Sequence, residues 1–305
     1  MNLGMEMLYH NMDDGFPDAI IKGLRASFLS EDQYSALRNS TNMADFKMAL
    51  EETDYAAYVV NEANPMEVST LRTKLKQKLK DELDYVHNQA VSPLTDFIQR
   101  ILHSYQIDNI VNIIEGLKNN IDLATLLKHA DPLGYFDELK TIRTSDTDDY
   151  TSLYETVLID LPVGQYFLRF LDKLMVANNQ RDSSMIPTIL KDYTPERIKN
   201  LLKKIWIKDL HQFCTLEWNM NGTTRAVMDD LLKFESDCMT IQILYNSIGN
   251  NEFSNSTGRT GVRKSYMNNL GKEASANGRL SVPRQGQGDQ PGRGLPQSQA
   301  GGRRV

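Results

Sequence analysis

Apolar residues recur along most of the chain at the three- and four-residue spacing of an amphipathic α-helix. A narrow stripe of this kind predicts a helix from about residue 67 to 89, and it consists of Val68, Leu71, Leu75, Leu79, Leu83 and Val86. A longer run of apolar positions opens at Pro93 and continues to Leu117. Apolar and polar residues alternate nowhere for more than four positions, so the pattern does not support strands. The sequence therefore predicts an all-α fold.

Capping signals mark where several helices begin. In two places a serine stands three residues before a side chain that can complete a capping box, at Ser30 with Gln33 and at Ser145 with Asp148. In three others a capping side chain directly precedes proline, the residue preset for the first helical position: Ser92-Pro93, Asp131-Pro132 and Thr194-Pro195. Five starts of this kind indicate a chain built from helices.

Two adjacent polar residues, Asp108 and Asn109, continue the apolar stripe that begins at Pro93. Burying either without a partner would cost about 1–3 kcal/mol, so we expect them to cap or bridge neighbouring helices. A hydrolase that pairs Asp108 with a distant histidine is an alternative. However, no histidine, lysine or second acid shares its helix face at helical spacing, which favours the structural interpretation.

Weak internal echoes suggest two similar lobes. Asp45-Phe46 and Asp149-Tyr150 each open an apolar stretch after a polar run, and two further acidic-then-apolar segments are expected to stop at Gly116 and Gly249. Each echo alone is a common chance match. We divide the chain into an N-terminal segment (1–14), helical lobe 1 (15–125), helical lobe 2 (126–249) and a disordered tail (250–305).

Charge is distributed unevenly. The last 60 residues hold nine Lys and Arg against three Asp and Glu, so the rest of the chain carries a net charge of −12 within an overall −6. An acidic body is a poor binder of a phosphate backbone, because such binding needs cationic surface. The alternative of an RNA-binding scaffold protein is therefore confined to the basic Gly/Arg/Gln-rich tail.

Sites for small-molecule chemistry are not evident. The glycines form no phosphate-binding loop, the five histidines are too scattered to share a metal, and Cys214 and Cys238 form no C-x-x-C pair. We predict no catalytic residue, no cofactor and no metal. The sequence offers neither 18 consecutive apolar residues nor a secretion signal at its start, which indicates a cytosolic protein.

Several strings resemble subunit d of the vacuolar-type proton ATPase in their order and approximate spacing. They extend over about residues 15 to 249, and the more distant archaeal branch of the family shares the architecture without them. The four most specific strings are Glu52-Thr53-Asp54-Tyr55, Asn61-Glu62-Ala63-Asn64-Pro65, Ser104-Tyr105-Gln106-Ile107-Asp108-Asn109-Ile110 and His129-Ala130-Asp131-Pro132-Leu133-Gly134.

The resemblance implies pseudo-threefold helical lobes and a non-catalytic subunit. Such a subunit links the central stalk to the proteolipid ring and couples ATP hydrolysis to proton translocation. The partners would be ring and stalk subunits, on the cytosolic face of vacuolar, endosomal or other acidic-organelle membranes. Polar residues in the strings are candidates for structural links or partner contacts: Asp54, Tyr55, Asn61, Glu62, Asp108 and Asn109.

The sequence departs from the family pattern after Gly249. Where the family continues into a third lobe, residues 250–305 are rich in Gly, Arg, Gln, Ser and Asn, with few apolar positions. We therefore expect two lobes and a tail in place of three lobes. A truncated form, an alternative splice form and a wrong reading frame would each produce this pattern.

Overall fold

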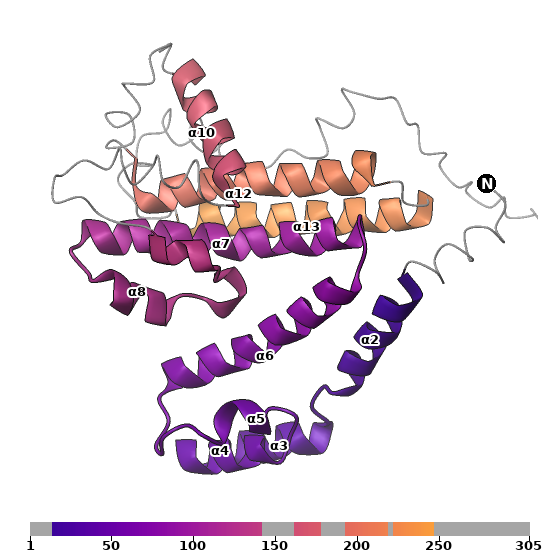
Figure 1. Ribbon diagram of the computed structural model, residues 1–305, viewed down its shortest axis with the longest axis vertical. Helices are drawn as coiled ribbons and strands as arrows, with labels where there is room; N and C mark the ends of the chain where they lie inside the picture. The colour runs from indigo at the N-terminus through magenta and orange to yellow at the C-terminus, as the bar shows by residue number, and fades with distance from the viewer. Residues whose placement is uncertain (1–13, 142–161, 178–192, 219–221, 247–305) are drawn as a thin grey trace, which may run out of the picture. The chain divides into compact units, whose positions relative to one another are not determined.

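The computed structural model describes residues 14–141, 162–177, 193–218 and 222–246, and all regular structure in these ranges is helical (Figure 1). This confirms the predicted all-α fold. The elements are α2 (Gly15–Ala26), α3 (Glu31–Asn39), α4 (Met43–Glu51), α5 (Ala56–Val59), α6 (Val68–Gln89), α7 (Leu94–Lys118), α8 (Leu123–His129), the 3₁₀ turns η2 (Pro132–Gly134) and η3 (Asp137–Thr141), α10 (Gly164–Ala177), α12 (Pro195–Gln212), the π-helical turn η5 (Phe213–Glu217) and α13 (Gly222–Asn246).

Most predicted helix starts are confirmed. The Ser30 hydroxyl accepts from the backbone N–H of Gln33, whose side chain accepts in turn from the backbone of Ser30. Thr194 caps α12 ahead of a proline, and Asp131 does the same for the short turn η2. The predicted start at residues 145–148 lies outside the described residues.

The helix start predicted at Ser92-Pro93 is confirmed to within one residue, but the predicted cap by Ser92 is wrong. Helix α7 begins at Leu94, and Ser92 caps no backbone group there. The carbonyl of Val91 already accepts the N–H groups of Leu94 and Thr95. The Ser92 hydroxyl instead donates to the Asp96 carboxylate at 2.8 Å.

Helix α7 does not stop at a glycine, contrary to the prediction. It runs through Gly116 to Lys118, and Asn120, with φ of 60°, reverses the chain. The N–H of Ile121 bonds to the Gly116 carbonyl in a Schellman arrangement. Gly116 serves packing instead, because a Cβ atom there would lie 2.3 Å from the Leu126 side chain. The other predicted stop, Gly249, lies outside the described residues.

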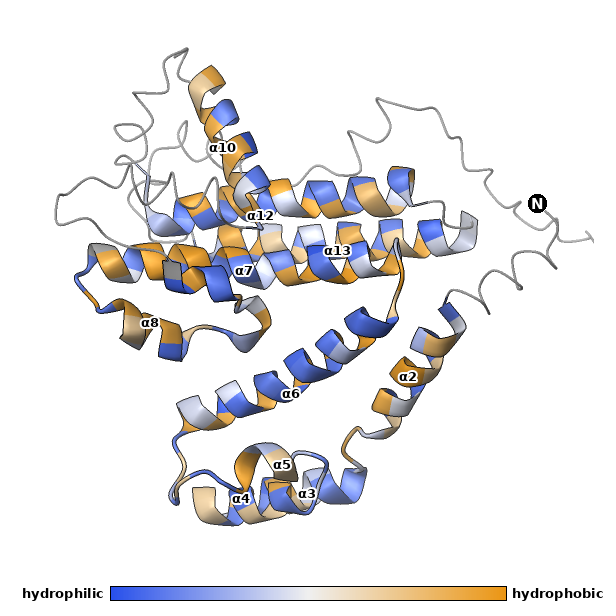
Figure 2. Ribbon diagram, in the orientation of Figure 1, coloured by the Kyte–Doolittle hydropathy of each residue, from blue (hydrophilic) through white to orange (hydrophobic). Residues whose placement is uncertain are grey.

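Three apolar clusters hold the described helices together. The first lies among α3, α4, α5 and the start of α6, around Leu50 and Val59. The second joins α2, α6 and the start of α7 through Val86 and Ile98. The third and largest joins α7, α8, α10, α12 and α13. Polar residues cover most of α6, whose ribbon is predominantly blue in Figure 2.

Helix α12 packs along both α7 and α13, and the three run side by side in Figure 1. Trp206 of α12 is 7% exposed, and Phe213 and Cys214 that follow it are buried, so these residues anchor the core. Leu216, at the end of the same stretch, is 77% exposed and does not. The π-helical turn η5 rotates the backbone between them and turns Leu216 outward.

In the described part of the chain, no helix combines the length and the apolarity needed to cross a lipid bilayer.

Candidate functional site

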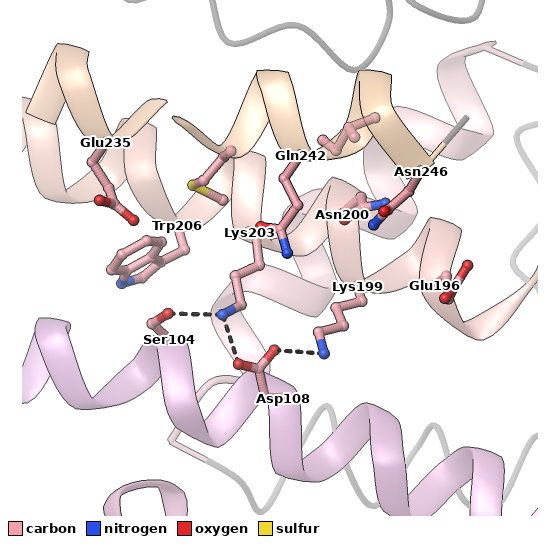
Figure 3. A pocket seen from close by; sticks show the side chains of 12 residues that line it. Ser104, Asp108, Glu196, Lys199, Asn200, Lys203, Trp206, Glu235, Gln242 and Asn246 are labelled. Atoms are coloured by element: carbon pink, nitrogen blue, oxygen red, sulfur yellow. Dashed lines mark hydrogen bonds and ion pairs between the residues drawn. The ribbon is translucent and has the colours of Figure 1, made fainter. Parts of the chain in front are cut away.

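A polar cleft of about 490 Å³ opens between α7, α12 and α13 (Figure 3). Asp108 projects into it from α7, and Lys199 and Lys203 reach it from α12. The two lysines lie four residues apart, which places them on the same face of their helix. The lining comprises Ser104, Asp108, Glu196, Lys199, Asn200, Lys203, Trp206, Glu235, Met239, Gln242, Ile243 and Asn246.

Asp108 is the centre of a bridge between two helices. Its Oδ2 accepts a hydrogen bond from Lys203 Nζ at 2.7 Å, and its Oδ1 lies 3.2 Å from Lys199 Nζ. Lys203 also donates to the Ser104 hydroxyl at 3.0 Å. The Asp108 side chain is only 25% exposed, so the pairing is partly shielded from water. The carboxylate therefore ties α7 to α12.

The lining of the cleft does not provide the histidine that would pair with Asp108 in the hydrolase alternative. None of the twelve lining residues is a histidine. The nearest partners of Asp108 are two ammonium groups, which match a salt bridge better than a general base waiting for a water molecule. Within this cleft, Asp108 thus links α7 to α12 through Lys199 and Lys203.

Asn109, the next residue, faces a different partner. Its side chain is 2% exposed. It donates to the Asp131 carbonyl at 2.9 Å and accepts from the Asp131 N–H at 2.8 Å. The Asp131 carboxylate in turn caps the N–H of Leu133 and pairs with Lys76 of α6. Asn109 therefore fixes the segment before η2 against α7.

The other four candidates, Asp54, Tyr55, Asn61 and Glu62, lie between the end of α4 and the start of α6. The Tyr55 ring packs in the first apolar cluster, with Lys78 Nζ 4.9 Å from its centroid. The Glu62 carboxylate pairs with Lys74 at 2.6 Å. Asp54 and Asn61 are exposed.

Glu62 also joins two helices through its backbone. Its carbonyl accepts from Lys47 Nζ at 2.6 Å, and the Lys47 side chain is buried in α4. With its carboxylate on Lys74 of α6, Glu62 ties α4 to α6. The six candidates therefore do not converge on one site. Asp108 and Asn109 of α7 have different partners, on α12 and in the segment before η2, and the other four lie around α4 to α6.

A second polar cluster, centred on Asp209 of α12, was not found from the sequence. Asp209 Oδ1 accepts from Arg169 of α10 at 2.7 Å, and Oδ2 accepts from the Tyr166 hydroxyl at 3.2 Å. Arg100 of α7 places its Nε 3.4 Å from the same carboxylate. The buried ring of His103 contacts the Tyr166 hydroxyl through Nδ1 at 2.9 Å. One aspartate thus holds α7, α10 and α12.

Burial changes the acid–base properties of this cluster. Burial, with a smaller contribution from the positive charge of Arg100, lowers the pKa of His103 to about 4. Burial also raises the pKa of Tyr166, and the neighbouring Asp209 carboxylate adds to the effect. Both groups are therefore neutral at pH 7. Since the Tyr166 proton points to Asp209, the neutral imidazole donates from Nδ1 to the Tyr166 oxygen.

Only part of these two clusters could be predicted from the sequence. Lys199 and Lys203 share a face on a helix whose start at Thr194 was correctly placed. Their partner Asp108 is 95 residues away from Lys203, and no spacing rule connects the two. Asp209 likewise gives no local sign of its partners on other helices.

Residues 14–141, 162–177, 193–218 and 222–246 contain no group of three or more His, Cys, Asp or Glu side chains that could hold a metal ion.

Comparison with known proteins identifies relatives. The family model described as the ATP synthase (C/AC39) subunit matches residues 17–274. The chain is 34% identical over 246 residues to a probable V-type proton ATPase subunit d of Oryza sativa subsp. japonica, covering 81% of this chain and 65% of that protein. It is 34% identical over 244 residues to the V-type proton ATPase subunit d of Dictyostelium discoideum, covering 80% and 63%.

A third relative is matched over a longer stretch. The V-type proton ATPase subunit d of Saccharomyces cerevisiae is 30% identical over 269 residues, covering 88% of this chain and 72% of the yeast protein. The chain spans less than two thirds of the rice and Dictyostelium proteins that it matches. The family match extends over most of the sequence, and the chain belongs to the ATP synthase (C/AC39) subunit family.

Proposed function

We propose that this protein is a non-catalytic subunit of a vacuolar-type proton-transporting ATPase, which links the central stalk to the proteolipid ring and so couples ATP hydrolysis to proton translocation. The observation that carries the proposal is the 30–34% identity to proteins named V-type proton ATPase subunit d, over 80–88% of this chain. A linker transmits force and needs no reacting groups of its own.

The polar bridges between helices support this role. Asp108 ties α7 to α12, Asp209 ties α7 and α10 to α12, and His211 of α12 contacts Asp229 of α13 at 2.7 Å. A packed apolar core resists compression, and charged links between helices add resistance to sliding. This construction favours stiffness over the accessible, unsatisfied groups that catalysis requires.

Contacts with the ring and the stalk, and the division into lobes at residues 15–125 and 126–249, stay predictions. So does the assignment of Asp54 and Asn61, whose exposed side chains are available to a partner. For location, we propose attachment through the complex to the cytosolic face of an acidic-organelle membrane.

Isolation of the tagged full chain from cells of its source tests the proposal. We expect subunits of both the proteolipid ring and the central stalk to be recovered with it, as measured by mass spectrometry. Recovery of the chain without either set would contradict the proposal.

Coupling is tested in the isolated complex by the ratio of proton transport to ATP hydrolysis. Replacing Asp209 by alanine loosens three helices, so we expect this ratio to fall while the complex still assembles. Asp137→Ala is the matched control, because Asp137 is 86% exposed and pairs with its near neighbour Lys140. An unchanged ratio for Asp209→Ala would count against force transmission through this part of the chain.

The alternative, an RNA-binding scaffold, depends on the tail, and residues 250–305 lie outside the described residues. The three relatives are named as ATPase subunits, which gives this alternative no support. Salt-sensitive RNA retention that disappears on deletion of residues 250–305 would be needed to revive it.

A further inference from the structure

Helix α13 carries a second apolar face that no described residue covers. Its members are separated by alternating four- and three-residue steps, and each is exposed: Val227, Leu231, Phe234, Cys238, Ile241 and Tyr245. The exposed fractions of Phe234, Ile241 and Tyr245 are 67%, 65% and 74%. We call these six residues the α13 stripe. With a rise of 1.5 Å per residue, it is about 27 Å long.

The stripe is separate from the face that α13 uses within the fold. Leu232, Ser236 and Thr240 are buried on the inner face, and Met228 and Met239 pack there against the largest apolar cluster. A helix with one neighbour needs a single apolar face. Two such faces on α13 indicate a second neighbour.

The spacing of the stripe identifies the shape of that neighbour. Steps of four and three residues repeat every seven, which keeps a seam in register with a second helix packed alongside. Three successive pairs of seam residues lie within α13. A flat or irregular partner surface would not need this regularity, so the stripe fits a helix.

Charge beside the stripe identifies the chemistry of the neighbour. In a seven-residue repeat with seam positions a and d, the position after each d and the position before each a, called e and g, face the flanks of the partner helix. Here Val227, Phe234 and Ile241 stand at d, and Leu231, Cys238 and Tyr245 stand at a. On α13 these positions include Asp230, Glu235 and Asp237, all of which are exposed. The basic residues of α13 do not offset them, because Arg225 precedes the stripe and Lys233 pairs with Asp229.

An acidic border excludes two other occupants. A second copy of α13 would bring carboxylates against carboxylates, since all three charged flanking positions carry the same sign. Anionic lipid surfaces would be repelled for the same reason. A helix with basic residues at its flanks gains both apolar contact and charge pairing.

We propose that the α13 stripe is a docking surface for an amphipathic helix of another protein, one with an apolar heptad seam and Lys or Arg on both sides of that seam. This inference is independent of the proposed role in the ATPase. Association would bury the six stripe residues and place the partner's cations beside Asp230, Glu235 and Asp237.

Binding of two synthetic peptides to the purified full chain tests the proposal. Both peptides are helices of about three heptads with leucine at the seam; one carries lysine at the flanking positions and the other glutamate. Titration followed by fluorescence anisotropy should show binding of the lysine peptide, weakened by added salt, and at least a roughly tenfold lower affinity for the glutamate peptide.

Matched variants locate the binding site. Phe234→Ala combined with Ile241→Ala should weaken the lysine peptide roughly tenfold or more, because large central side chains dominate helix docking. Phe28→Ala combined with Leu216→Ala is the control; both residues are more than 70% exposed and lie off α13. Neutralising the three flanking acids to amides should also weaken binding. The same change at the exposed residues Asp32, Asp137 and Asp172 should not.

Several results would overturn the proposal. Equal affinity for the two peptides, or equal loss in the stripe and control variants, would show attraction to the acidic body alone. Sedimentation showing a dimer that Phe234→Ala dissociates would assign the stripe to a second copy. Binding that requires removal of residues 247–305 would assign the stripe to this chain's own C-terminal segment.

Discussion

The side-chain amide of Asn109 pairs with both backbone groups of Asp131, donating to its carbonyl at 2.9 Å and accepting from its N–H at 2.8 Å. It does what a neighbouring strand would do for an extended residue. The sequence places an asparagine at this point of an apolar stripe because only an amide offers a donor and an acceptor side by side.

Replacing Asn109 by alanine should therefore leave two backbone groups without partners. We expect the free energy of unfolding to fall by about 2–6 kcal/mol, since each of the two unsatisfied groups costs about 1–3 kcal/mol. Urea denaturation followed by circular dichroism measures the change. Asn112→Ala, at an exposed position of the same helix, is the control and should shift stability by less than about 0.5 kcal/mol.

Gly134 lies against the same region and should tolerate no side chain. A Cβ atom there would lie 2.3 Å from the Tyr105 carbonyl oxygen and 2.8 Å from Asn109 Nδ2. The first of these is backbone and cannot move aside easily, so Gly134→Ala should destabilise the fold by about 1–3 kcal/mol.

The matched control for Gly134 is Gly23. A Cβ atom at Gly23, within α2, would meet nothing within 4 Å. Gly23→Ala should therefore raise stability by about 0.5–1 kcal/mol through higher helix propensity. Thermal unfolding of the two variants should move in opposite directions. If both moved the same way, the packing argument for Gly134 would fail.

Asp209 should contribute more to stability than any surface ion pair. Asp209→Ala removes the common partner of Arg100, Arg169 and Tyr166, and the Asp209 side chain is 14% exposed. We expect the free energy of unfolding to fall by about 2–3 kcal/mol. This is less than for a fully buried ion pair, because Arg169 is half exposed. Asp137→Ala, at an exposed pair, should change the free energy of unfolding by less than about 1 kcal/mol.

His103 should make the fold sensitive to mild acid. Its pKa is about 4 in the folded protein and 6.5 as the ordinary value, so the unfolded chain takes up a proton first as pH falls. The contribution of the neutral ring is complete above pH 6.5 and is lost as the pH drops to about 4, a loss of about 3 kcal/mol. Nε2 has no hydrogen-bond partner among the described residues, so a proton there would be buried unpaired.

The measurement is the free energy of unfolding between pH 7 and pH 4 for wild type and His103→Gln. The difference between the two curves should shrink as the pH falls, because carboxylates contribute equally to both. His129→Gln, at an exposed position, is the control for the loss of an imidazole elsewhere on the chain. A constant offset for His103→Gln would contradict the assignment.

The predictability of the fold varied with the range of the interaction involved. The α6 bounds and the Ser30 capping box depend on residues within one or two turns, and the sequence pattern was sufficient for them. At Ser92 the helix start was predicted to within one residue, but the cap was not, because the Val91 carbonyl accepts the N–H groups of Leu94 and Thr95, and a capping motif does not reveal this competition. The helix end predicted at Gly116 was wrong, because the glycine is needed there for a close contact with Leu126 of another helix and not to end α7.

The candidate site was only partly accessible from the sequence for the same reason. A polar pair on an apolar stripe pointed to Asp108 and Asn109, because burial makes a partner necessary. The identity of the partners, Lys203 and Asp131, depends on how the chain folds back on itself. Asp209 lies beside ordinary helical residues, and its three partners come from α7 and α10.

Both tryptophans of the chain, Trp206 and Trp218, pack in or against the largest apolar cluster, and the Trp206 indole donates to the Arg100 carbonyl of α7 at 2.6 Å. Intrinsic tryptophan fluorescence therefore reports on the packing between α7 and α12 without an added label. Helices α2 to α6 hold no indole, so they could melt first without any change in that signal. If far-ultraviolet ellipticity falls at a lower denaturant concentration than tryptophan emission changes, two parts of this chain unfold separately.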